Sequence, residues 1–174
     1  CIMINKNNDK LYLSVNVFPM KAQGEIVGVY GIAKDITDQK RMQDKIEYIA
    51  NYDQLTGLPN RYHIYNYIEE LIAEERVDNF AILFIDLDKF KVINDSLGHT
   101  AGDLFLEEVA ERLKSAVRED DIVSRLGGDE FIIIIEEGSR DIIKKVSNRI
   151  IKKISETFIV KDNKISTSPS IGIS

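Results

Sequence analysis

Two glycines followed by two acids, between two apolar stretches, constrain the fold of this chain more than any other feature. Residues 121–126 read Asp-Ile-Val-Ser-Arg-Leu, residues 127–131 read Gly-Gly-Asp-Glu-Phe, and residues 132–135 are isoleucines. Apolar runs on both sides of a glycine turn are typical of a β-hairpin, because glycine readily adopts the positive φ angles of tight turns. The sequence therefore predicts a hairpin with Asp129 and Glu130 at its tip, either solvated or holding a metal ion.

A second acidic site follows an apolar run. Residues 81–85, Ala-Ile-Leu-Phe-Ile, predict a short strand buried on both faces, and the run ends in Asp86, Leu87 and Asp88. Carboxylates without a neighbouring His or Cys cluster are hard oxygen ligands, which favour Mg²⁺ or Mn²⁺ over zinc. Mg²⁺ held by few carboxylates commonly completes its shell with phosphate oxygens. The two sites indicate a phosphate-binding metal centre, with solvated strand-end acids as the alternative.

Four blocks of sequence resemble, in order, the GGDEF-domain diguanylate cyclases. They are Asp53-Gln-Leu-Thr-Gly-Leu-Pro-Asn-Arg61, Asp86-Leu-Asp-Lys-Phe-Lys-Val-Ile-Asn-Asp95, Gly98-His-Thr-Ala-Gly-Asp103 and Arg125-Leu-Gly-Gly-Asp-Glu-Phe131. The resemblance covers about residues 50 to 174. It implies condensation of two GTP molecules into cyclic di-GMP, with release of two pyrophosphates.

The resemblance also implies the reacting groups. Asp86 and Asp129 match the side-chain metal ligands, and the Leu87 carbonyl matches a backbone ligand. Asp129 also matches the proton acceptor, and Glu130 beside it is placed to reach a second metal or the attacking hydroxyl. Lys91 matches a cation aimed at the charge that builds up when a ribose 3′-hydroxyl attacks an α-phosphate, although a surface lysine would look the same in sequence.

Five further residues match positions around the substrate. They are Asn94, His99, Asp103, Gly127 and Gly128. A carboxylate such as Asp103 accepts from the N1–H and amine of guanine, and an amide such as Asn94 satisfies the remaining polar edge. His99 in a glycine-flanked turn is equally compatible with a structural hydrogen bond. Residues 94–95 are also compatible with a loop before a helix that begins near Ala101.

A product-inhibition site is implied upstream of the hairpin. Residues 118–121, Arg-Glu-Asp-Asp, match the RxxD motif of the family. An arginine fork beside a carboxylate suits recognition of guanine and phosphate in a bound product. Arg118 is also compatible with a cation in the last turn of a helix. The candidate residues for product inhibition are Arg118, Asp121 and Arg149. Arg149 lies where the family often carries a second inhibitory arginine.

The apolar pattern predicts an α+β fold for this part of the chain, and the resemblance implies an α/β sandwich of the nucleotidyl-cyclase kind. The expected helices are 61–76, 101–118 and 140–157, with Asn60 as the cap of the first, and the expected strands are 80–86, 121–126, 130–136 and 165–173. Without the first helix the order is β-α-β-β-α-β, which is that of a ferredoxin-like sheet with helices on one face. Phe131 and residues 132–135 are expected in the core.

The first 52 residues predict a different organisation. Alternating side chains over 11–18 and 26–30, with a turn at Gly24, predict two antiparallel strands. With residues 31–38, Gly-Ile-Ala-Lys-Asp-Ile-Thr-Asp, they resemble the end of a PAS sensor domain, the alternative being an edge hairpin. We therefore expect a PAS fragment over 1–38, a linker helix over 39–52 and a GGDEF domain over 53–174.

The linker helix carries an apolar stripe of Met42, Ile46 and Ile49. Thr37 or Asp38 is expected to cap this helix. The stripe suits either a short coiled coil between two protomers or a packed amphipathic helix. The resemblance favours a homodimer whose geometry the helix transmits.

Composition limits the classes of protein to which this chain can belong. The chain has 174 residues, of which 44% are hydrophobic and 30% charged, and no apolar run long enough to cross a bilayer, as in soluble globular proteins. A net charge of −6 argues against nonspecific nucleic-acid binding. The single cysteine, Cys1, excludes an internal disulfide and fits the cytoplasm.

We expect a piece of a longer protein, because the chain opens without Met and ends at Ser174, before the helix and strands in which the family carries further phosphate-binding cations. The full-length protein is compatible with an upstream membrane anchor. The expected function is a diguanylate cyclase under sensor control and product feedback. The alternative is an inactive GGDEF module that binds GTP or cyclic di-GMP as a regulatory receptor; the intact acids and glycines favour the enzyme.

Overall fold

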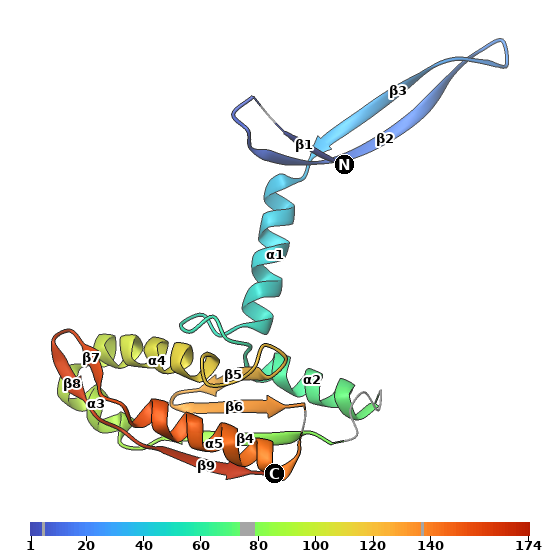
Figure 1. Ribbon diagram of the computed structural model, residues 1–174. Coiled ribbons are helices and arrows are strands. Elements are labelled where there is room, and N and C mark those ends of the chain that lie inside the picture. The colour runs from blue at the N-terminus through green and yellow to red at the C-terminus, as the bar shows by residue number, and fades with distance from the viewer. Residues whose placement is uncertain (5, 74–78, 137) are drawn as a thin grey trace. The chain divides into compact units, whose positions relative to one another are not determined.

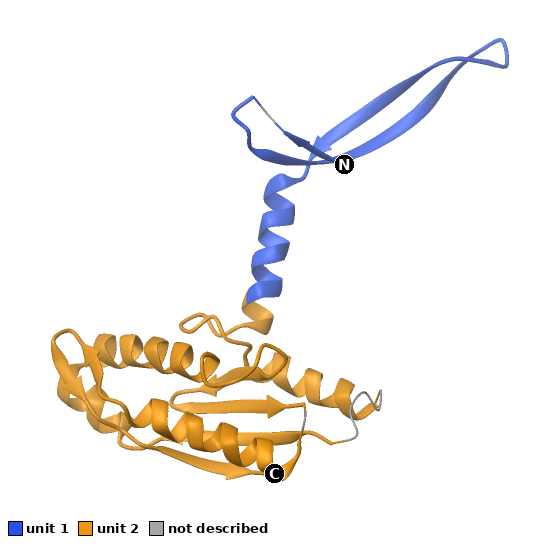
Figure 2. Ribbon diagram, in the orientation of Figure 1, with its two compact units in different colours: residues 1–48 blue, residues 49–174 orange. Residues whose placement is uncertain are grey.

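The structure is a computed structural model that describes residues 1–4, 6–73, 79–136 and 138–174. The chain divides into two compact units, residues 1–48 and 49–174, which are coloured separately in Figure 2. Among the helices of the described ranges, none is both long and apolar enough to cross a membrane.

The first unit contains an antiparallel sheet of three strands in the order β1-β2-β3. The strands are β1 (Ile2–Ile4), β2 (Lys10–Ala22) and β3 (Glu25–Asp35). Gln23 and Gly24 form the turn of the β2–β3 hairpin with φ angles of 51° and 88°, as two-residue hairpin loops require. The two predicted strands are confirmed, and both are longer than expected because backbone pairing continues to the turn.

At the start of helix α1 (Thr37–Asn51), the backbone of Thr37 bonds to a side chain that precedes the helix. The Thr37 N–H donates to the Asp35 carboxylate at 2.8 Å. The hydroxyl of Thr37 instead accepts the Tyr12 N–H at 2.9 Å. Capping by Thr37 is therefore wrong, because its oxygen is committed to strand β2, and Asp35 takes that role. Bonding to Thr37, first with its side chain and then with its backbone, lowers the pKa of Asp35.

The second unit is built on a four-stranded antiparallel sheet in the order β5-β6-β4-β9 (Figure 1). The strands are β4 (Ala81–Leu87), β5 (Ile122–Gly127), β6 (Glu130–Ile135) and β9 (Pro169–Ile173); the helices are α2 (Arg61–Ala73), α3 (Phe90–Leu97), α4 (His99–Lys114) and α5 (Arg140–Ser155). A small hairpin of β7 (Phe158–Val160) and β8 (Asn163–Ile165) precedes β9. The predicted α+β, ferredoxin-like order is confirmed.

Helices cover the two faces of this sheet unequally. Phe131, Ile133 and Ile135 of β6 belong to the core that α4 and α5 close, whereas Ile132 and Ile134 pack with α2 on the opposite face. The core assignment of residues 131–135 is confirmed. On β4, however, Phe84 is 47% exposed. Burial of residues 81–85 on both faces is therefore wrong, because the core around α2, as far as the chain is described, lies mainly over β5 and β6.

Some elements differ from the sequence prediction. Residues 90–97 form helix α3 rather than a loop, and Gly98, with φ 81° and ψ 158°, separates it from α4. Helix α4 ends at Lys114, so Arg118 is not in a last helical turn. Residues 165–173 are interrupted between β8 and β9, because Thr167 and Ser168 bond to Asp88 instead of continuing a strand. The end predicted for helix 61–76 lies outside the described residues.

Candidate active site

The Gly-Gly-Asp-Glu segment forms the tip of the β5–β6 hairpin, as predicted. Gly127 pairs with Glu130 across the ladder, which leaves Gly128 and Asp129 as the turn. The φ angles of Gly127 and Gly128 are 140° and 57°. Side chains other than hydrogen are disfavoured at both angles, so the two glycines allow the tight turn that presents Asp129.

Asp86 lies directly opposite Glu130 in the β4–β6 ladder. Side chains of residues paired in this way leave the same face of the sheet, and like charges there repel. Burial raises the pKa of Asp86, and the negative charges of Asp129 and Glu130 raise it further. The hairpin tip and the end of β4 therefore bring three carboxylates into electrostatic contact.

These oxygens fit a divalent cation, which would relieve the repulsion. In the described part of the chain, no three His, Cys, Asp or Glu side chains are arranged to hold a metal ion by themselves. A metal at Asp86 and Asp129 therefore needs further ligands, and the predicted Leu87 carbonyl with phosphate oxygens is the chemically suitable completion.

Asp88, the third acidic position of this region, serves the fold. Its carboxylate accepts from the hydroxyls of Ser168 and Ser170, the latter at 2.9 Å, and these two bonds lower its pKa. The Asp88 N–H donates to the Ser168 carbonyl at 3.0 Å. Asp88 thus fastens the end of β4 to the start of β9.

A pocket of about 380 Å³ lies beside the carboxylates. Asp86 and Glu130 line it together with Phe84, Leu126 and Ile171. The Arg61 guanidinium, in the first turn of α2, lies 3.8 Å from the Glu130 carboxylate. A lining that is part apolar and part charged suits a ligand that has both a flat ring and a charged group.

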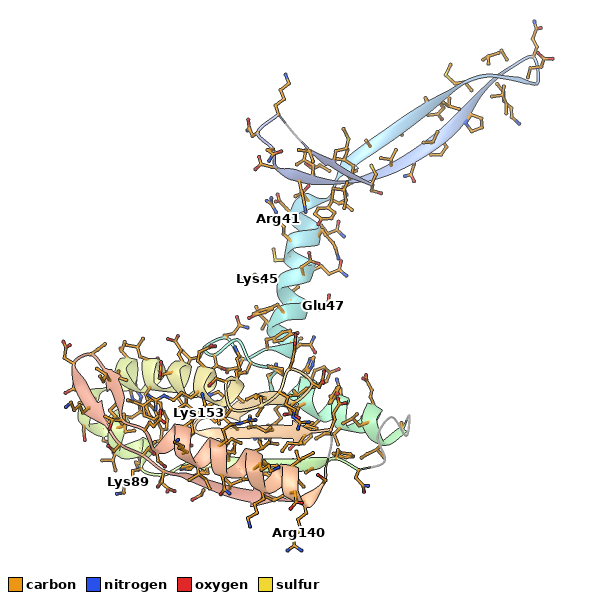
Figure 3. The ribbon with its side chains drawn as sticks, viewed as in Figure 1. Arg41, Lys45, Glu47, Lys89, Arg140 and Lys153 are labelled. Atoms are coloured by element: carbon orange, nitrogen blue, oxygen red, sulfur yellow. The ribbon has the colours of Figure 1, made fainter. Side chains whose placement is uncertain are left out.

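The predicted nucleotide contacts lie on α3 and α4. Lys91 is in the first turn of α3, after Lys89, whose side chain projects outward in Figure 3. Asn94 follows on α3, and His99 and Asp103 lie in the first turns of α4. Across the described ranges, the side chains of Lys91, Asn94, His99 and Asp103 form no hydrogen bond with protein.

Gly102 controls the place of Asn94. A Cβ at Gly102 would lie 1.9 Å from the Asn94 Oδ1, so only glycine lets this amide rest against α4. No role for Gly102 was predicted from the sequence. A glycine inside a helix ordinarily lowers the stability of the helix, and the neighbour that requires it here comes from another helix.

Comparison with known proteins decides the family. Residues 50–174 match the family model described as diguanylate cyclase, GGDEF domain. The chain belongs to the GGDEF family.

Individual proteins are also similar to this chain in sequence. The signaling protein YkoW of Bacillus subtilis is 38% identical over 172 residues, which cover 95% of this chain and 21% of YkoW. The cyclic di-GMP phosphodiesterase PdeR of Escherichia coli is 33% identical over 140 residues, 80% of this chain and 21% of PdeR. The solved GGDEF domain of TpbB from Pseudomonas aeruginosa is 39% identical with a TM-score of 0.65, covering 70% of this chain and 73% of that chain. The chain thus spans about a fifth of the two curated relatives.

The GGDEF hairpin rests on a buried arginine whose role was not assigned from sequence. The Arg125 Nε and Nη2 donate to the Gly128 carbonyl at 3.0 and 2.8 Å, and Nη1 donates to the Asp53 carboxylate at 2.9 Å. The Asp53 carboxylate also accepts from the Thr56 N–H and hydroxyl at 2.9 and 2.6 Å. Arg125 thereby ties the turn that presents Asp129 to the loop before α2.

The pKa of Asp53 reflects these contacts. Burial, the largest influence, raises the pKa of Asp53, but the hydrogen bonds from Thr56 and Arg125 together outweigh it, and the net shift is downward. The only feature of the sequence that pointed to a contact between Asp53 and Arg125 was their opposite charge. Spacing alone did not reveal it, because the partners lie 72 positions apart.

The predicted product-inhibition residues gather after the end of α4. The Arg118 N–H donates to the Asp121 carboxylate at 2.9 Å, and both residues line a pocket of about 330 Å³. Arg149, on α5, donates its Nε–H to the Ala116 carbonyl. The structure therefore brings Arg118 and Asp121 together, while Arg149 has a backbone partner two residues before Arg118.

Proposed function

We propose that this GGDEF domain condenses two molecules of GTP into cyclic di-GMP and releases two pyrophosphates. The observation that supports it most is the placement of Asp86 opposite Glu130, with Asp129 on an intact Gly-Gly turn beside them. Three acids that repel one another are suited to a site that works with a cation and an anionic substrate.

Each residue has a proposed task. Asp86, Asp129 and the Leu87 carbonyl would hold Mg²⁺ (or Mn²⁺), and Glu130 would be available to a second ion. When bound, the ion orients the phosphates and neutralises charge on them. Asp129 accepts the proton of the attacking 3′-hydroxyl.

The remaining residues position the substrate. Lys91 attracts the phosphates from the start of α3, while Asn94, His99 and Asp103 contact guanine. Gly127 and Gly128 allow the nucleotide to approach the backbone closely. The task of this set is to bring the α-phosphate within reach of the hydroxyl.

The homodimer is part of this proposal, because one site holds one GTP and two phosphodiester bonds need two facing sites. Met42, Ile46 and Ile49 of α1 are exposed at the spacing of a two-stranded seam. The charged Arg41, Lys45 and Glu47 project outward from the same helix in Figure 3. We propose that α1 pairs with its counterpart in a second protomer.

Sensor control completes the proposal. We assign residues 1–38 to the end of a PAS domain, residues 39–52 to the linker helix and residues 53–174 to the cyclase domain. Phe18, Tyr30 and Ile32 lie on one face of the β2–β3 hairpin and are exposed, and contiguous apolar surface of this kind ordinarily belongs to an interface. Because GTP is the substrate, the reaction is proposed to take place in the cytoplasm.

Feedback is proposed to act through Arg118 and Asp121, with a smaller part for Arg149. Arg118→Ala should weaken binding of cyclic di-GMP in calorimetry and raise the amount of product accumulated, while the initial rate stays nearly unchanged. Asp121→Ala should act in the same direction, and Arg149→Ala more weakly. Equal product affinity in the wild type and Arg118→Ala would remove this site.

A receptor without activity is the second candidate, favoured by the similarity to PdeR, which is named a phosphodiesterase. Incubating the full-length protein with GTP and Mg²⁺, followed by chromatography of the nucleotides, separates the two. Cyclic di-GMP that forms with the wild type and not with Asp129→Asn supports the cyclase. Binding of GTP or cyclic di-GMP in calorimetry with no product from the wild type supports the receptor.

A further inference from the structure

Arg61 lies against the candidate metal site but has no task in the function proposed above. Its Nη2 is 3.8 Å from the Oε2 of Glu130. Of the ion pairs among the described residues, no other involves Asp86, Asp129 or Glu130. The guanidinium of Arg61 is therefore the protein's own counter-ion for Glu130.

The start of α2 fixes the backbone that carries Arg61. The Asn60 Oδ1 accepts the His63 N–H at 3.0 Å, which caps the first turn of the helix. One residue earlier, the Pro59 carbonyl accepts the Arg125 N–H of β5 at 3.0 Å. The helix turn that presents Arg61 is thus bonded to the strand that leads into the Gly-Gly-Asp-Glu hairpin.

The pair between Arg61 and Glu130 contributes little to the fold. The side chain of Arg61 is 58% exposed and that of Glu130 is 56% exposed. Water and salt screen a pair of this kind, and its separation is longer than that of a direct hydrogen bond. Rotation of two exposed side chains is enough to break the pair. A stronger cation can therefore take the place of the guanidinium on Glu130.

A divalent ion and the guanidinium seek the same carboxylate oxygens. Arginine keeps its positive charge at every practical pH, so it neutralises Glu130 whenever no other cation is bound. Binding of one cation to Glu130 weakens binding of the other, and this linkage is reciprocal. Asp86, opposite Glu130 in the ladder, adds negative charge that favours the doubly charged ion over the singly charged one.

We propose that Arg61 is an internal counter-ion that competes with a divalent ion for Glu130. While the pair is formed, the guanidinium holds the Glu130 carboxylate and lowers its affinity for an ion. Binding of the ion to Glu130 releases the guanidinium. Arg61 is thus a positioning residue that acts through Glu130. The inference rests on the proposed function, in which Glu130 is available to a second ion, and it adds what holds this carboxylate before the ion binds.

Titration of the full-length protein with Mn²⁺, with the free ion measured by electron paramagnetic resonance, tests the competition. Arg61→Gln removes the charge and keeps a polar side chain. We expect Arg61→Gln to bind Mn²⁺ roughly three-fold more tightly than the wild type, because the loss of an exposed ion pair corresponds to a change of this size. Arg61→Lys, which keeps the charge, should lie between the two. Equal affinity in the wild type and Arg61→Gln overturns the proposal.

The gain in affinity has to pass through Glu130. In a Glu130→Gln background, Arg61→Gln should change the affinity for Mn²⁺ by less than about 1.5-fold. An equal gain in both backgrounds would show that any loss of positive charge near the acids has this effect, and it would overturn the competition for Glu130.

Arg140→Gln is the matched control. Arg140 is exposed at the start of α5, on the opposite face of the sheet from α2, and it points outward in Figure 3. This variant should bind Mn²⁺ as the wild type does, and a gain equal to that of Arg61→Gln contradicts the proposal. Without metal, the melting temperatures of Arg61→Gln and Arg140→Gln should stay within about 2 °C of the wild type, because exposed charges contribute little to stability.

A nucleotide arm separates this inference from the proposed function. The titration is repeated with Mn²⁺ and 3′-deoxy-GTP, which lacks the attacking hydroxyl and is therefore not consumed. If Arg61→Gln binds Mn²⁺ more tightly and the wild type forms no cyclic di-GMP from GTP, the cyclase proposal fails and the competition stands. If the wild type forms cyclic di-GMP and Arg61→Gln leaves the affinity for Mn²⁺ unchanged with and without 3′-deoxy-GTP, only the competition fails.

Discussion

Arg125 and Asp53 are joined by a 2.9 Å charged hydrogen bond between two motifs that lie far apart in the sequence. The Arg125 side chain is only 9% exposed, and that of Asp53 is 21% exposed. A guanidinium in such a place needs its partner, because an unpaired buried charge is costly. Stability of the fold and the shape of the Gly-Gly-Asp-Glu turn therefore depend on the same pair.

Asp53→Ala should lower the free energy of unfolding by about 2–3 kcal/mol, because it leaves the buried Arg125 without its carboxylate. Urea denaturation at neutral pH measures the change. Glu111→Ala is the control, since it removes an ion pair with Lys114 in which Glu111 is 69% exposed, and it should cost less than about 0.5 kcal/mol. Similar costs for the two variants would contradict the role assigned to Arg125.

The advantage of the wild type over Asp53→Asn should depend on pH. The pKa of Asp53 is lowered on folding from its ordinary value of 3.8, so the ionised carboxylate stabilises the folded state. This contribution is present above pH 3.8 and is lost as the pH falls through the lower pKa of the folded state. Denaturation curves of both proteins should converge in acid and stay apart at neutral pH.

Asp86→Asn should separate stability from activity. Without divalent metal at neutral pH the variant should be slightly more stable, by less than about 1 kcal/mol, because it removes one of two like charges that face each other. Product formation in the full-length protein should be abolished, as it should be in Asp129→Asn, because each loses a metal-ligand charge. Mg²⁺ with GTP should raise the melting temperature of the wild type and not that of Asp86→Asn. A variant that keeps near wild-type turnover would overturn the metal assignment.

The two glycines of the turn should differ when replaced by alanine. A Cβ at either position meets no atom within 4 Å, so any cost comes from the backbone alone. At Gly128, φ 57° is in the left-handed region that alanine enters for about 1 kcal/mol, whereas Gly127 at φ 140° lies where glycine is nearly obligatory, for about 2–3 kcal/mol. In urea denaturation without nucleotide, Gly127→Ala should have a lower free energy of unfolding than Gly128→Ala. Equal losses of stability in the two variants would argue against a backbone origin of the cost.

Gly102→Ala should weaken GTP binding more than it weakens the fold. The new methyl group displaces the Asn94 amide, which is proposed to contact guanine. We expect roughly ten-fold weaker GTP binding in calorimetry, similar to the loss in Asn94→Ala, because both remove the same hydrogen bonds. Full affinity in Gly102→Ala together with reduced affinity in Asn94→Ala would show that the amide finds another position.

The rate per protomer should increase with protein concentration, because the proposed condensation of two GTP molecules needs two sites that face each other. Ile46→Glu, which places a charge in the exposed stripe of α1, should shift this dependence to higher concentration. Ultracentrifugation under the same conditions gives the oligomeric state. A turnover number independent of concentration in a monomeric protein would rule out the dimer.

Local chemistry made much of this fold predictable. The glycine turn, the strand β6 and the Asn60 cap follow from neighbouring residues, and the structure confirms them. Helix α3 was missed because residues 89–98 carry turn-forming residues, and the left-handed Lys89 that precedes α3 has no clear sequence signal. Exposure of Phe84 was missed because an apolar run does not tell which face a helix covers.

The sequence allowed the residues of the candidate site to be named, but it did not allow the contacts among them to be predicted. The four motifs named the acids and the helix residues, but the contacts that hold them depend on tertiary structure. Arg125 bonds to Gly128 and Asp53 only once the strands have paired and the loop before α2 has packed on them. Likewise, the Asn94 side chain lies against Gly102 only once α3 and α4 have packed together. The place of Asp88 on Ser168 and Ser170 likewise depends on how β9 meets β4.

The apolar strand β6 also affects how the chain behaves before it folds. Phe131 and the four isoleucines after it are buried on both faces, and the run contains no charge and no proline. Such a segment aggregates readily when it is exposed, and charged residues at its ends oppose this. Asp129, Glu130 and Glu136 flank the run. We therefore expect the acids of the hairpin tip to oppose aggregation of the unfolded chain as well as to form the candidate metal site.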